Sequence, residues 1–341
     1  MKEHASGKTM QAAFHVGRQR LEIREVPLPE IAEDECLIRT NACAICGSDG
    51  KWWASEGTNK MQGHESVGTV VKSGKKVNIV KEGDRVVPYV MTGCGTCAFC
   101  AQGYYIYCYR ITGVTTGFAE YQVFRERYLM PLPGGMCNEV ATLIGDTLGT
   151  PLRAVRKLEL RGGETVVVNG LGPLGLVAVQ ALSFFGAETI IGIDVLESRR
   201  RLAEELGATV TLDAKQANVR EEVFRLTKNL GAHAAINAVN DNEAAAMAFN
   251  LLRGGGRLIL VAGSCGTYGA QSGIKGQAER QVLGTFYFPR MDYEDNLKIV
   301  SGGFINLERL VSHVYPLEKI NEAFEMRFSH ADASLKVVIT L

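Results

Sequence analysis

The sequence predicts an α/β protein that joins a β-rich domain to a domain with a doubly wound parallel sheet. Three observations support this fold class. Short alternating strands separated by glycine-rich turns run from residue 11 to residue 124. Helical and strand-like segments alternate from residue 148 to residue 286, and residues 164–194 form one complete strand–turn–helix–strand unit. At 341 residues, the chain is long enough for two domains with separate cores.

Composition and charge argue against several classes of protein. Lys and Arg together number 37, as do Asp and Glu, so no basic excess favours a nucleic-acid partner. No apolar stretch reaches the roughly 18 residues that a membrane span needs. Residues 1–10 lack the apolar segment of a signal peptide, and we expect them to form a frayed tail. The sequence therefore predicts a cytoplasmic protein with no membrane partner.

The β-rich domain carries candidate functional side chains in its loops. The predicted strands lie at residues 21–23, 36–39, 66–71, 85–89 and 119–124. Cys46 and His64 fall in two of the loops, with Ser48, Asp49 and Glu65 beside them. Alone, a cysteine or histidine is more often a core residue. Together they predict an open zinc site, because catalytic zinc takes such ligands and keeps one exchangeable water.

A third ligand for this site is expected from Asp146. It lies in the apolar segment 140–148, where an unpaired carboxylate would cost free energy. A metal ion explains a carboxylate there better than a solvated loop does.

A second, different metal site is predicted in the lobe at about residues 91–110. Its four cysteines follow the spacing Cys94-x2-Cys97-x2-Cys100-x7-Cys108. Without an export signal, the chain's nine cysteines argue against a disulfide framework. Four thiolates close a tetrahedral zinc site and leave no position for substrate, so this zinc is predicted to be structural.

The unit at residues 164–194 predicts a dinucleotide site. An apolar strand at 165–168 precedes a glycine-rich turn, a helix runs to about residue 185, and a second strand ends at Asp194. Gly170 allows a tight turn, Gly172 lets the backbone approach a pyrophosphate, and Gly175 lets helix and strand pack closely. The full turn is Gly170-Leu171-Gly172-Pro173-Leu174-Gly175. The phosphates are expected at the helix N-terminus.

Asp194 favours NAD over NADP, because its carboxylate accepts hydrogen bonds from a ribose diol and repels a 2′-phosphate. Arg199 is expected near the adenine, with Arg200 and Arg201 facing solvent, although all three could in principle hold a phosphate. Further helices are predicted at residues 148–158, 198–206, 219–230, 243–252 and 317–328, and strands at 209–212, 234–239, 257–261, 281–286 and 335–341. Val261, which ends one of these strands, is another predicted cofactor contact.

Taken together, these pieces resemble the zinc-containing medium-chain alcohol and polyol dehydrogenases, such as sorbitol and threonine dehydrogenases. The matching pieces span essentially the whole chain: residues 46–49, 63–65, the four cysteines, Gly117-Phe-Ala-Glu-Tyr121, the glycine turn and Asp194. The resemblance implies a GroES-like catalytic domain, residues 1–147 with 287–341, and a Rossmann NAD-binding domain, residues 148–286. It places the active site in the cleft between them.

Carried over residue by residue, the resemblance implies that Cys46 and His64 bind the catalytic zinc. Whether Asp146 completes the site or Glu65 replaces it stays open. Asp49 should orient His64, as carboxylates do for metal-bound imidazoles. Ser48 should pass the substrate proton towards solvent. Lys51 stands where many simple alcohol dehydrogenases have a histidine that ends this relay.

The resemblance further implies that Thr150 contacts the nicotinamide and that Lys336 reaches the pyrophosphate. It implies two zinc ions per subunit and a homodimer or homotetramer. The expected reaction is hydride transfer from a secondary alcohol to NAD, with a polyol, sugar or cyclitol favoured by Glu65, Asp146 and Gly47. An L-threonine 3-dehydrogenase, a simple secondary-alcohol dehydrogenase and a non-enzymatic NAD-binding redox sensor are the alternatives. Trp52 and Trp53 either pack in the core and at the rim, or stack on a sugar ring.

Overall fold

The computed structural model describes residues 8–216, 218–262 and 279–341, which form two compact units. Unit 1 comprises residues up to 146 together with 289–293 and 307–341, and unit 2 comprises residues 147–288 and 294–306. Residues 294–306 were predicted to belong with the β-rich domain, but they cluster with unit 2. The reason is visible in two hydrogen bonds, from Arg156 to Asn296 Oδ1 at 2.8 Å and from the Asn306 amide to Gln180 Oε1 at 2.7 Å.

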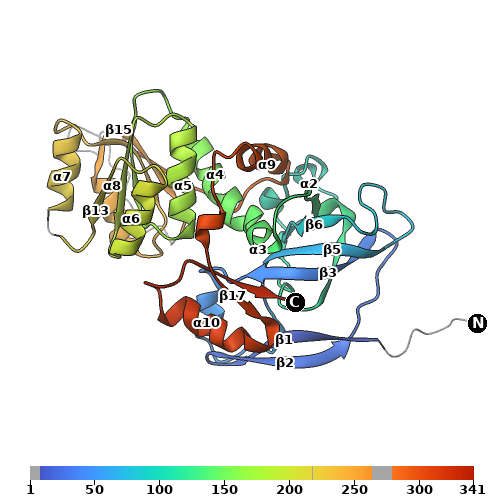
Figure 1. Ribbon diagram of the computed structural model, residues 1–341. Coiled ribbons are helices and arrows are strands. Elements are labelled where there is room, and N and C mark those ends of the chain that lie inside the picture. Colours follow the sequence, from blue (N-terminus) through green and yellow to red (C-terminus); the bar gives the residue numbers. More distant parts are fainter. Residues whose placement is uncertain (1–7, 217, 263–278) are drawn as a thin grey trace, which may run out of the picture. The chain divides into compact units, whose positions relative to one another are not determined.

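Unit 1 is built around a mostly antiparallel sheet in the order β10-β6-β5-β3-β18-β17, with β9 also pairing β3. Figure 1 shows β3 and β5 side by side. The strands of this sheet are β3 (Glu35–Ala44), β5 (Glu65–Ser73), β6 (Arg85–Pro88), β9 (Tyr121–Arg125), β10 (Leu129–Pro131), β17 (Val311–Pro316) and β18 (Lys336–Thr340). A second sheet has the order β2-β1-β4, from β1 (Thr9–Gly17), β2 (Arg20–Pro27) and β4 (Lys60–Met61).

Unit 1 also contains several short helices and strands. Its α-helices are α1 (Asp49–Trp53), α2 (Ala98–Ala101), α3 (Asn138–Ala141) and α10 (Ile320–Ser329). The strands β7 (Met91–Thr92) and β8 (Thr112–Gly113) form a two-stranded ribbon. The short 3₁₀ turns are η1 (Tyr105–Tyr107), η2 (Glu126–Tyr128), η3 (Thr142–Ile144), η4 (Arg290–Asp292), η5 (Glu308–Leu310) and η6 (Leu317–Lys319).

The predicted frayed tail is wrong at Thr9 and Met10. These residues begin β1 and pair with Pro27 and Val26 of β2. The Met10 side chain is buried in a small cluster with Ala12 and Ala119. Burial of this apolar side chain holds the strand end in place.

Unit 2 contains one parallel sheet in the order β13-β12-β11-β14-β15-β16, as a doubly wound fold requires. Its strands are β11 (Thr165–Asn169), β12 (Thr189–Asp194), β13 (Val210–Asp213), β14 (Ala232–Asn237), β15 (Leu252–Leu260) and β16 (Gln281–Gly284). Its helices are α4 (Asp146–Leu158, with its first residue in unit 1), α5 (Pro173–Phe184), α6 (Glu197–Glu205), α7 (Val219–Leu226), α8 (Asn242–Asn250) and α9 (Tyr293–Ser301).

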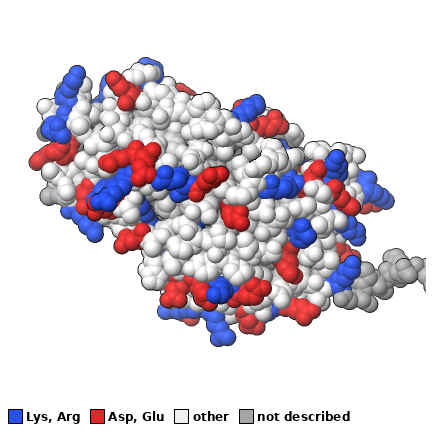
Figure 2. Space-filling view, viewed as in Figure 1, with Lys and Arg blue, Asp and Glu red and all other residues white. Residues whose placement is uncertain are grey.

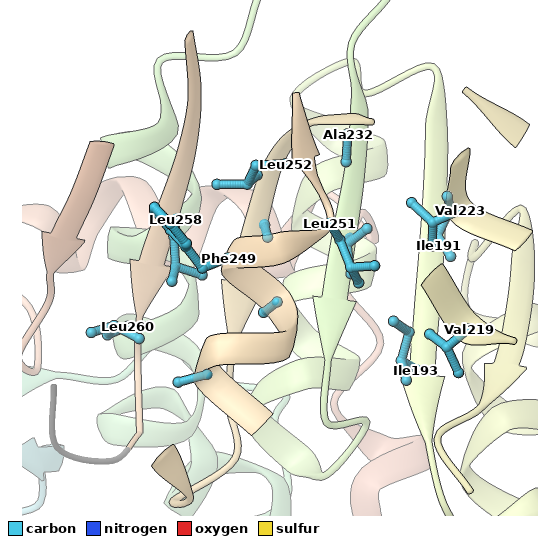
Figure 3. Packing of buried hydrophobic residues seen from close by; sticks show 14 residues of the cluster. Ile191, Ile193, Val219, Val223, Ala232, Phe249, Leu251, Leu252, Leu258 and Leu260 are labelled. Carbon is cyan, nitrogen blue, oxygen red and sulfur yellow. The ribbon is translucent and has the colours of Figure 1, made fainter. Parts of the chain in front are cut away.

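The core of unit 2 lies between the sheet and helices α7 and α8. Figure 3 shows Ile191 and Ile193 of β12 facing Val219 and Val223 of α7. Phe249 of α8 packs in the same cluster, which also holds residues of β14 and β15. Burying each large aliphatic side chain stabilises the fold by roughly 1.5–3 kcal/mol. This rigid sheet fixes the loops that leave its carboxyl edge.

The surface agrees with the balanced charge of the chain. Basic and acidic side chains are interspersed over the face shown in Figure 2, with no broad area of one sign. Within the described ranges, none of the helices combines the length and apolar character needed to cross a membrane.

Candidate metal centres and dinucleotide site

The register of two strands brings the first set of metal donors together. Cys46 follows the end of β3, and His64 precedes the start of β5, its antiparallel neighbour. Ala44 pairs with Glu65 across these strands, so the two flanking loops meet at one end of the sheet. Asp146 comes from the first residue of α4, after the turns α3 and η3 that pack against β3 and β5.

The resulting mixed cluster consists of Cys46, His64, Glu65 and Asp146, whose donor atoms all lie within 4.8 Å of one another. Asp146 Oδ2 is 3.8 Å from Cys46 Sγ and 3.7 Å from His64 Nε2. A thiolate, an imidazole and carboxylates at this separation are the donor set of a catalytic zinc site. The residues fit the predicted metal, and the structure places both Asp146 and Glu65 in the cluster.

Asp49 supports this cluster from a buried position. Its Oδ2 accepts a hydrogen bond from the Cys46 amide at 2.9 Å, and its Oδ1 lies 3.4 Å from His64 Nδ1. The carboxylate is 1% exposed. Because Nδ1 is turned to Asp49, the Nε2 atom of His64 faces the metal donors, as in other histidine sites oriented by a carboxylate.

Trp52 is a contributor that the sequence did not predict. Its indole Nε1 donates a hydrogen bond to Asp49 Oδ1 at 3.0 Å, and its ring packs against Phe324. Trp53 is instead a core residue, 5% exposed, in the cluster around Phe324. One signal was present in the sequence: Trp52 follows Asp49 at a spacing of three, which places both side chains on one side of a helical turn.

Lys336, which was predicted to reach the pyrophosphate, lies in unit 1 beside the mixed cluster. Its side chain is buried, and its ammonium donates to Glu65 Oε2 within the mixed cluster. The register of β18 explains this, since Val338 pairs with Ala44 and Ile45 donates its amide to the Val337 carbonyl. In this placement the ammonium donates to Glu65, and the predicted contact with the pyrophosphate stays a prediction.

The electrostatics of the mixed cluster favour a bound cation. Burial lowers the pKa of His64, but Asp49, Cys46 and Asp146 outweigh it and leave the pKa well above its ordinary value. Burial likewise lowers the pKa of Lys336, while Glu65, Cys46 and Asp146 raise it overall. Both groups therefore report a negative potential, which a divalent metal ion would neutralise.

Ser48 and Lys51 lie at the exposed side of the same loop. Ser48 precedes α1, and its hydroxyl makes no capping hydrogen bond to that helix within the described structure. Lys51 is exposed in the last turn of α1. The relay roles predicted for them are not tested by this arrangement and stay predictions.

The four-cysteine cluster is compact and local. The sulfur atoms of Cys94, Cys97, Cys100 and Cys108 all lie within 4.8 Å of one another. Backbone amides point at two of them: those of Cys94 and Arg110 each donate to Cys108 Sγ at 3.3 Å, and that of Thr96 to Cys94 Sγ at 3.5 Å. Such N–H···S bonds stabilise metal-bound thiolates.

The backbone geometry around the four cysteines and the pKa values of their thiols fit four thiolates bound to one metal ion. A Cβ at Gly93 would lie 2.5 Å from Cys100 Sγ, so only glycine lets the chain pass there. Hydrogen bonds from Thr96 and the Cys97 amide lower the pKa of Cys94 to about 5. Burial raises the pKa of Cys100 to about 12, so this thiol needs a cation to ionise at neutral pH.

In unit 2, the glycine turn adopts the geometry that a close backbone approach requires. Gly170 has a φ of +91°, and a Cβ at Gly175 would lie 1.9 Å from the Gly170 carbonyl oxygen. Gly172 caps α5, Pro173 is its first residue, and Leu174 follows. The turn therefore presents the N-terminus of a twelve-residue helix, the usual place for a phosphate.

Asp194 is held at the carboxyl edge beside this turn. Its Oδ2 accepts from the Leu171 amide at 2.7 Å and its Oδ1 from the Leu196 amide at 2.9 Å. Arg199 lies 4.0 Å from the carboxylate. Arg200 was expected to face solvent, but its side chain is only 16% exposed. It donates to the Asp194 carbonyl at 2.9 Å and lies 3.5 Å from Asp213.

The structure shows where Thr150 and Val261 lie, and their predicted contacts with the cofactor stay predictions. Thr150 lies buried in α4. Val261 directly follows β15 and donates its amide to the Asn237 carbonyl at 2.9 Å. Asn237 and Asn169, which the sequence reading missed, are buried at the same edge and hydrogen-bonded at 2.9 Å. A signal existed, since both polar residues end apolar strands just before the loops.

Comparison with known proteins also divides the chain into two domains. Residues 32–134 match the alcohol dehydrogenase GroES-like domain, and residues 173–302 match the zinc-binding dehydrogenase family. The chain is 28% identical to the sorbitol dehydrogenase of Bacillus subtilis strain 168, over 98% of each chain. It is 30% identical to the L-threonine 3-dehydrogenase of Bacillus velezensis, over 89% of this chain and 91% of the relative.

A solved structure gives the same result for the fold. A protein from Sinorhizobium meliloti 1021, described as a zinc-binding dehydrogenase and bound to NADP, superposes with a TM-score of 0.87. It is 25% identical, and the match covers 98% of this chain and 100% of that chain. The fold class predicted from the sequence, a GroES-like unit with a Rossmann unit, is thereby confirmed.

Proposed function

The chain belongs to the zinc-containing medium-chain dehydrogenase family, and from that premise we propose that it transfers a hydride from a secondary alcohol of the polyol, sugar or cyclitol type to NAD. The observation that carries this proposal is the mixed cluster, whose four donors converge on one point beside an exposed hydroxyl. Structural zinc sites are usually built from cysteine and histidine alone, whereas catalytic sites also use carboxylate ligands and keep a position for water.

The residues of unit 1 have distinct proposed roles. Zinc and NAD, when bound, supply polarisation of the alcohol oxygen and a hydride acceptor. Cys46, His64 and Asp146 would hold the zinc, with Asp49 fixing the orientation of the imidazole. Glu65 belongs to the same cluster, and its hydrogen bond from Lys336 holds its carboxylate beside the other donors. Ser48 would accept the substrate proton and pass it to solvent near Lys51.

The preference for NAD rests on Asp194. Its two oxygens are fixed by backbone amides, so the carboxylate cannot swing away from a ribose at the carboxyl edge. A 2′-phosphate would meet this fixed negative charge. Because a relative by fold binds NADP, and Arg199 and Arg200 lie close by, the choice needs a direct test. Replacing Asp194 with Ser should raise the KM for NAD at least tenfold and reduce the discrimination against NADP.

The four-cysteine cluster is proposed to hold the second zinc of each subunit. Its donors are all thiolates, which complete a tetrahedral site without a place for substrate. The proposed role is therefore to stabilise the lobe between β7 and β8.

We also propose a homodimer or homotetramer. The strand β16 ends the parallel sheet of unit 2, so one of its edges is unpaired among the described strands. Unpaired edges pair readily with a second copy of the same strand. Light scattering coupled to size-exclusion chromatography measures this directly, and a monomeric mass would contradict it.

L-Threonine 3-dehydrogenase is the second candidate activity, favoured by the 30% identity to that enzyme. A panel of polyols, sugars, cyclitols, simple secondary alcohols and L-threonine, assayed by NAD reduction, separates the candidates. Turnover on a polyol-type substrate supports the proposal, and turnover on L-threonine alone replaces it. NADH binding without turnover on any member would favour the redox sensor instead.

A further inference from the structure

Unit 2 contains a cavity of about 510 Å³ that none of the functions above uses. It lies at the amino ends of β11, β14, β15 and β16, next to the end of α4. The glycine turn and Asp194 lie at the opposite, carboxyl ends of β11 and β12. The five residues of β11 alone span roughly 16 Å, so this amino-edge cavity is separate from the dinucleotide site.

The lining of the amino-edge cavity is predominantly basic. Four cations face two carboxylates: Lys157, Arg161, Arg253 and Arg257 against Glu159 and Glu164. Glu164 is already neutralised, because it accepts from Arg257 at 2.5 Å and from the Arg161 amide at 3.1 Å. Lys157 donates to the Gly284 carbonyl. Arg161 is exposed, and Arg253 donates its Nε to the neighbouring Gly254 carbonyl at 3.2 Å, which leaves its terminal nitrogens for a ligand. These two side chains are the best placed to meet one.

Two further donors line the same space. His233 Nδ1 accepts from the Thr165 amide at 3.0 Å, which places the proton of a neutral ring on Nε2 as a donor. Arg257 Nε is buried without a hydrogen-bond partner within the described structure. A ligand oxygen at this position would satisfy that buried donor.

The pKa values of two basic groups in the cavity are lowered, partly by repulsion from neighbouring cations. Burial lowers the pKa of His233, and Arg253 and Arg257 lower it further, although Glu164 opposes them. Burial also lowers the pKa of Lys157, with repulsion from Arg153 adding to it. An anion in the cavity would relieve these repulsions.

We propose that the amino-edge cavity binds a small phosphate monoester. The planar guanidinium groups of Arg161 and Arg253 suit the oxygen geometry of a phosphate. The volume falls within the roughly 300–1,000 Å³ of small-molecule sites, which leaves room for an organic part beyond the phosphate. This second site is independent of hydride transfer and of the dinucleotide.

Isothermal titration calorimetry of the zinc-loaded enzyme tests this proposal. Glucose 6-phosphate is titrated at low salt in the presence of saturating NADH, which keeps the dinucleotide site filled, and glucose serves as the uncharged control. We expect binding of the phosphate and none of glucose. The double variant Arg161→Gln, Arg253→Gln should weaken that binding at least tenfold. Arg225→Gln, an exposed change on α7 away from the cavity, should leave it unchanged.

Three results would overturn the proposal: no binding to the wild-type enzyme, equal affinity in the double variant, or binding that vanishes once NADH saturates. Equal weakening by Arg225→Gln would also overturn it, because it would show unspecific charge attraction. Arg161→Gln alone, at an exposed residue, provides a variant that retains the fold. Unchanged alcohol turnover in these variants distinguishes failure here from failure of the proposed reaction.

Discussion

The two metal-donor clusters of unit 1 are built in opposite ways. The four-cysteine cluster takes like donors from one segment, residues 94–108, and receives backbone N–H groups at its sulfur atoms. The mixed cluster takes three kinds of donor from residues 46, 64, 65 and 146, and side chains support it: Asp49 at the histidine and Lys336 at Glu65. The first is closed and local, while the second depends on the whole sheet.

This difference has a physical meaning. Four thiolates satisfy zinc completely, so their binding energy can only stabilise the fold. A site with a thiolate, an imidazole and a carboxylate as its protein ligands keeps one position for an exchangeable water, and buried charges around the ligands tune it. Removing the four-cysteine cluster should therefore lower the stability of the fold, and removing the mixed cluster should lower the catalytic activity.

The largest effect is expected from Cys46→Ala. Loss of the thiolate removes the zinc of the mixed cluster and with it several kcal/mol of transition-state stabilisation, so turnover should fall more than about 10³-fold. NADH binding, measured by fluorescence titration, should stay within twofold of wild type, because the glycine turn and Asp194 belong to unit 2. A comparable loss of NADH affinity would contradict the separation of the two sites.

The next effect is on stability. Cys97→Ser opens the four-cysteine cluster, and the free energy of zinc binding is then lost from folding. We expect the thermal midpoint to fall by about 10 °C or more, since 1 kcal/mol shifts it by about 2–4 °C in domains of this size. Cys137→Ser is the matched control, because Cys137 is exposed and lies outside both clusters. Equal midpoints for the two variants would show that the cluster does not stabilise the lobe.

Lys336→Met examines the buried ion pair of the mixed cluster. Removing the ammonium leaves the Glu65 carboxylate buried without its partner, which costs about 3–5 kcal/mol of unfolding free energy. Urea unfolding measures the loss, and adding Glu65→Gln should recover part of it. The exposed Lys319→Met serves as the control. A loss no larger than that of this control would mean that the pair contributes nothing.

The smallest expected effect concerns Trp52. Trp52→Phe keeps the ring against Phe324 but removes the hydrogen bond to Asp49. Loss of such an indirect support costs about 10–100-fold in metal affinity or activity, and we expect the lower end. Trp53→Phe is the control, since Trp53 packs in the core around Phe324. Competition for zinc with a chelator measures the affinity, and equal values for the two variants would remove Trp52 from the site.

The same contrast explains how much could be predicted from the sequence. The four-cysteine cluster and the glycine turn are each formed by residues that lie close together in the sequence, so residue spacing alone predicted them. The strands of unit 2 were placed well for the same reason, because parallel strands appear as continuous apolar runs. The fold class followed from these local patterns.

Other features depend on long-range pairing and were missed or misplaced. Lys336 joins the mixed cluster only because β18 pairs with β3, which no local pattern reveals. The edge strand β17 alternates half-buried and exposed residues, so its apolar signal is weak. Residues 294–306 were assigned to the wrong unit, because the contacts of α9 with α4 are invisible in sequence.

The central claim is that unit 1 binds two metals with different purposes. Elemental analysis of zinc per chain, on the wild type and on Cys46→Ala, tests it most directly. We expect about two zinc ions in the wild type and about one in the variant, which should keep the wild-type thermal midpoint within a few degrees. One zinc in both proteins, with no turnover on any alcohol, would show that the mixed cluster holds no metal.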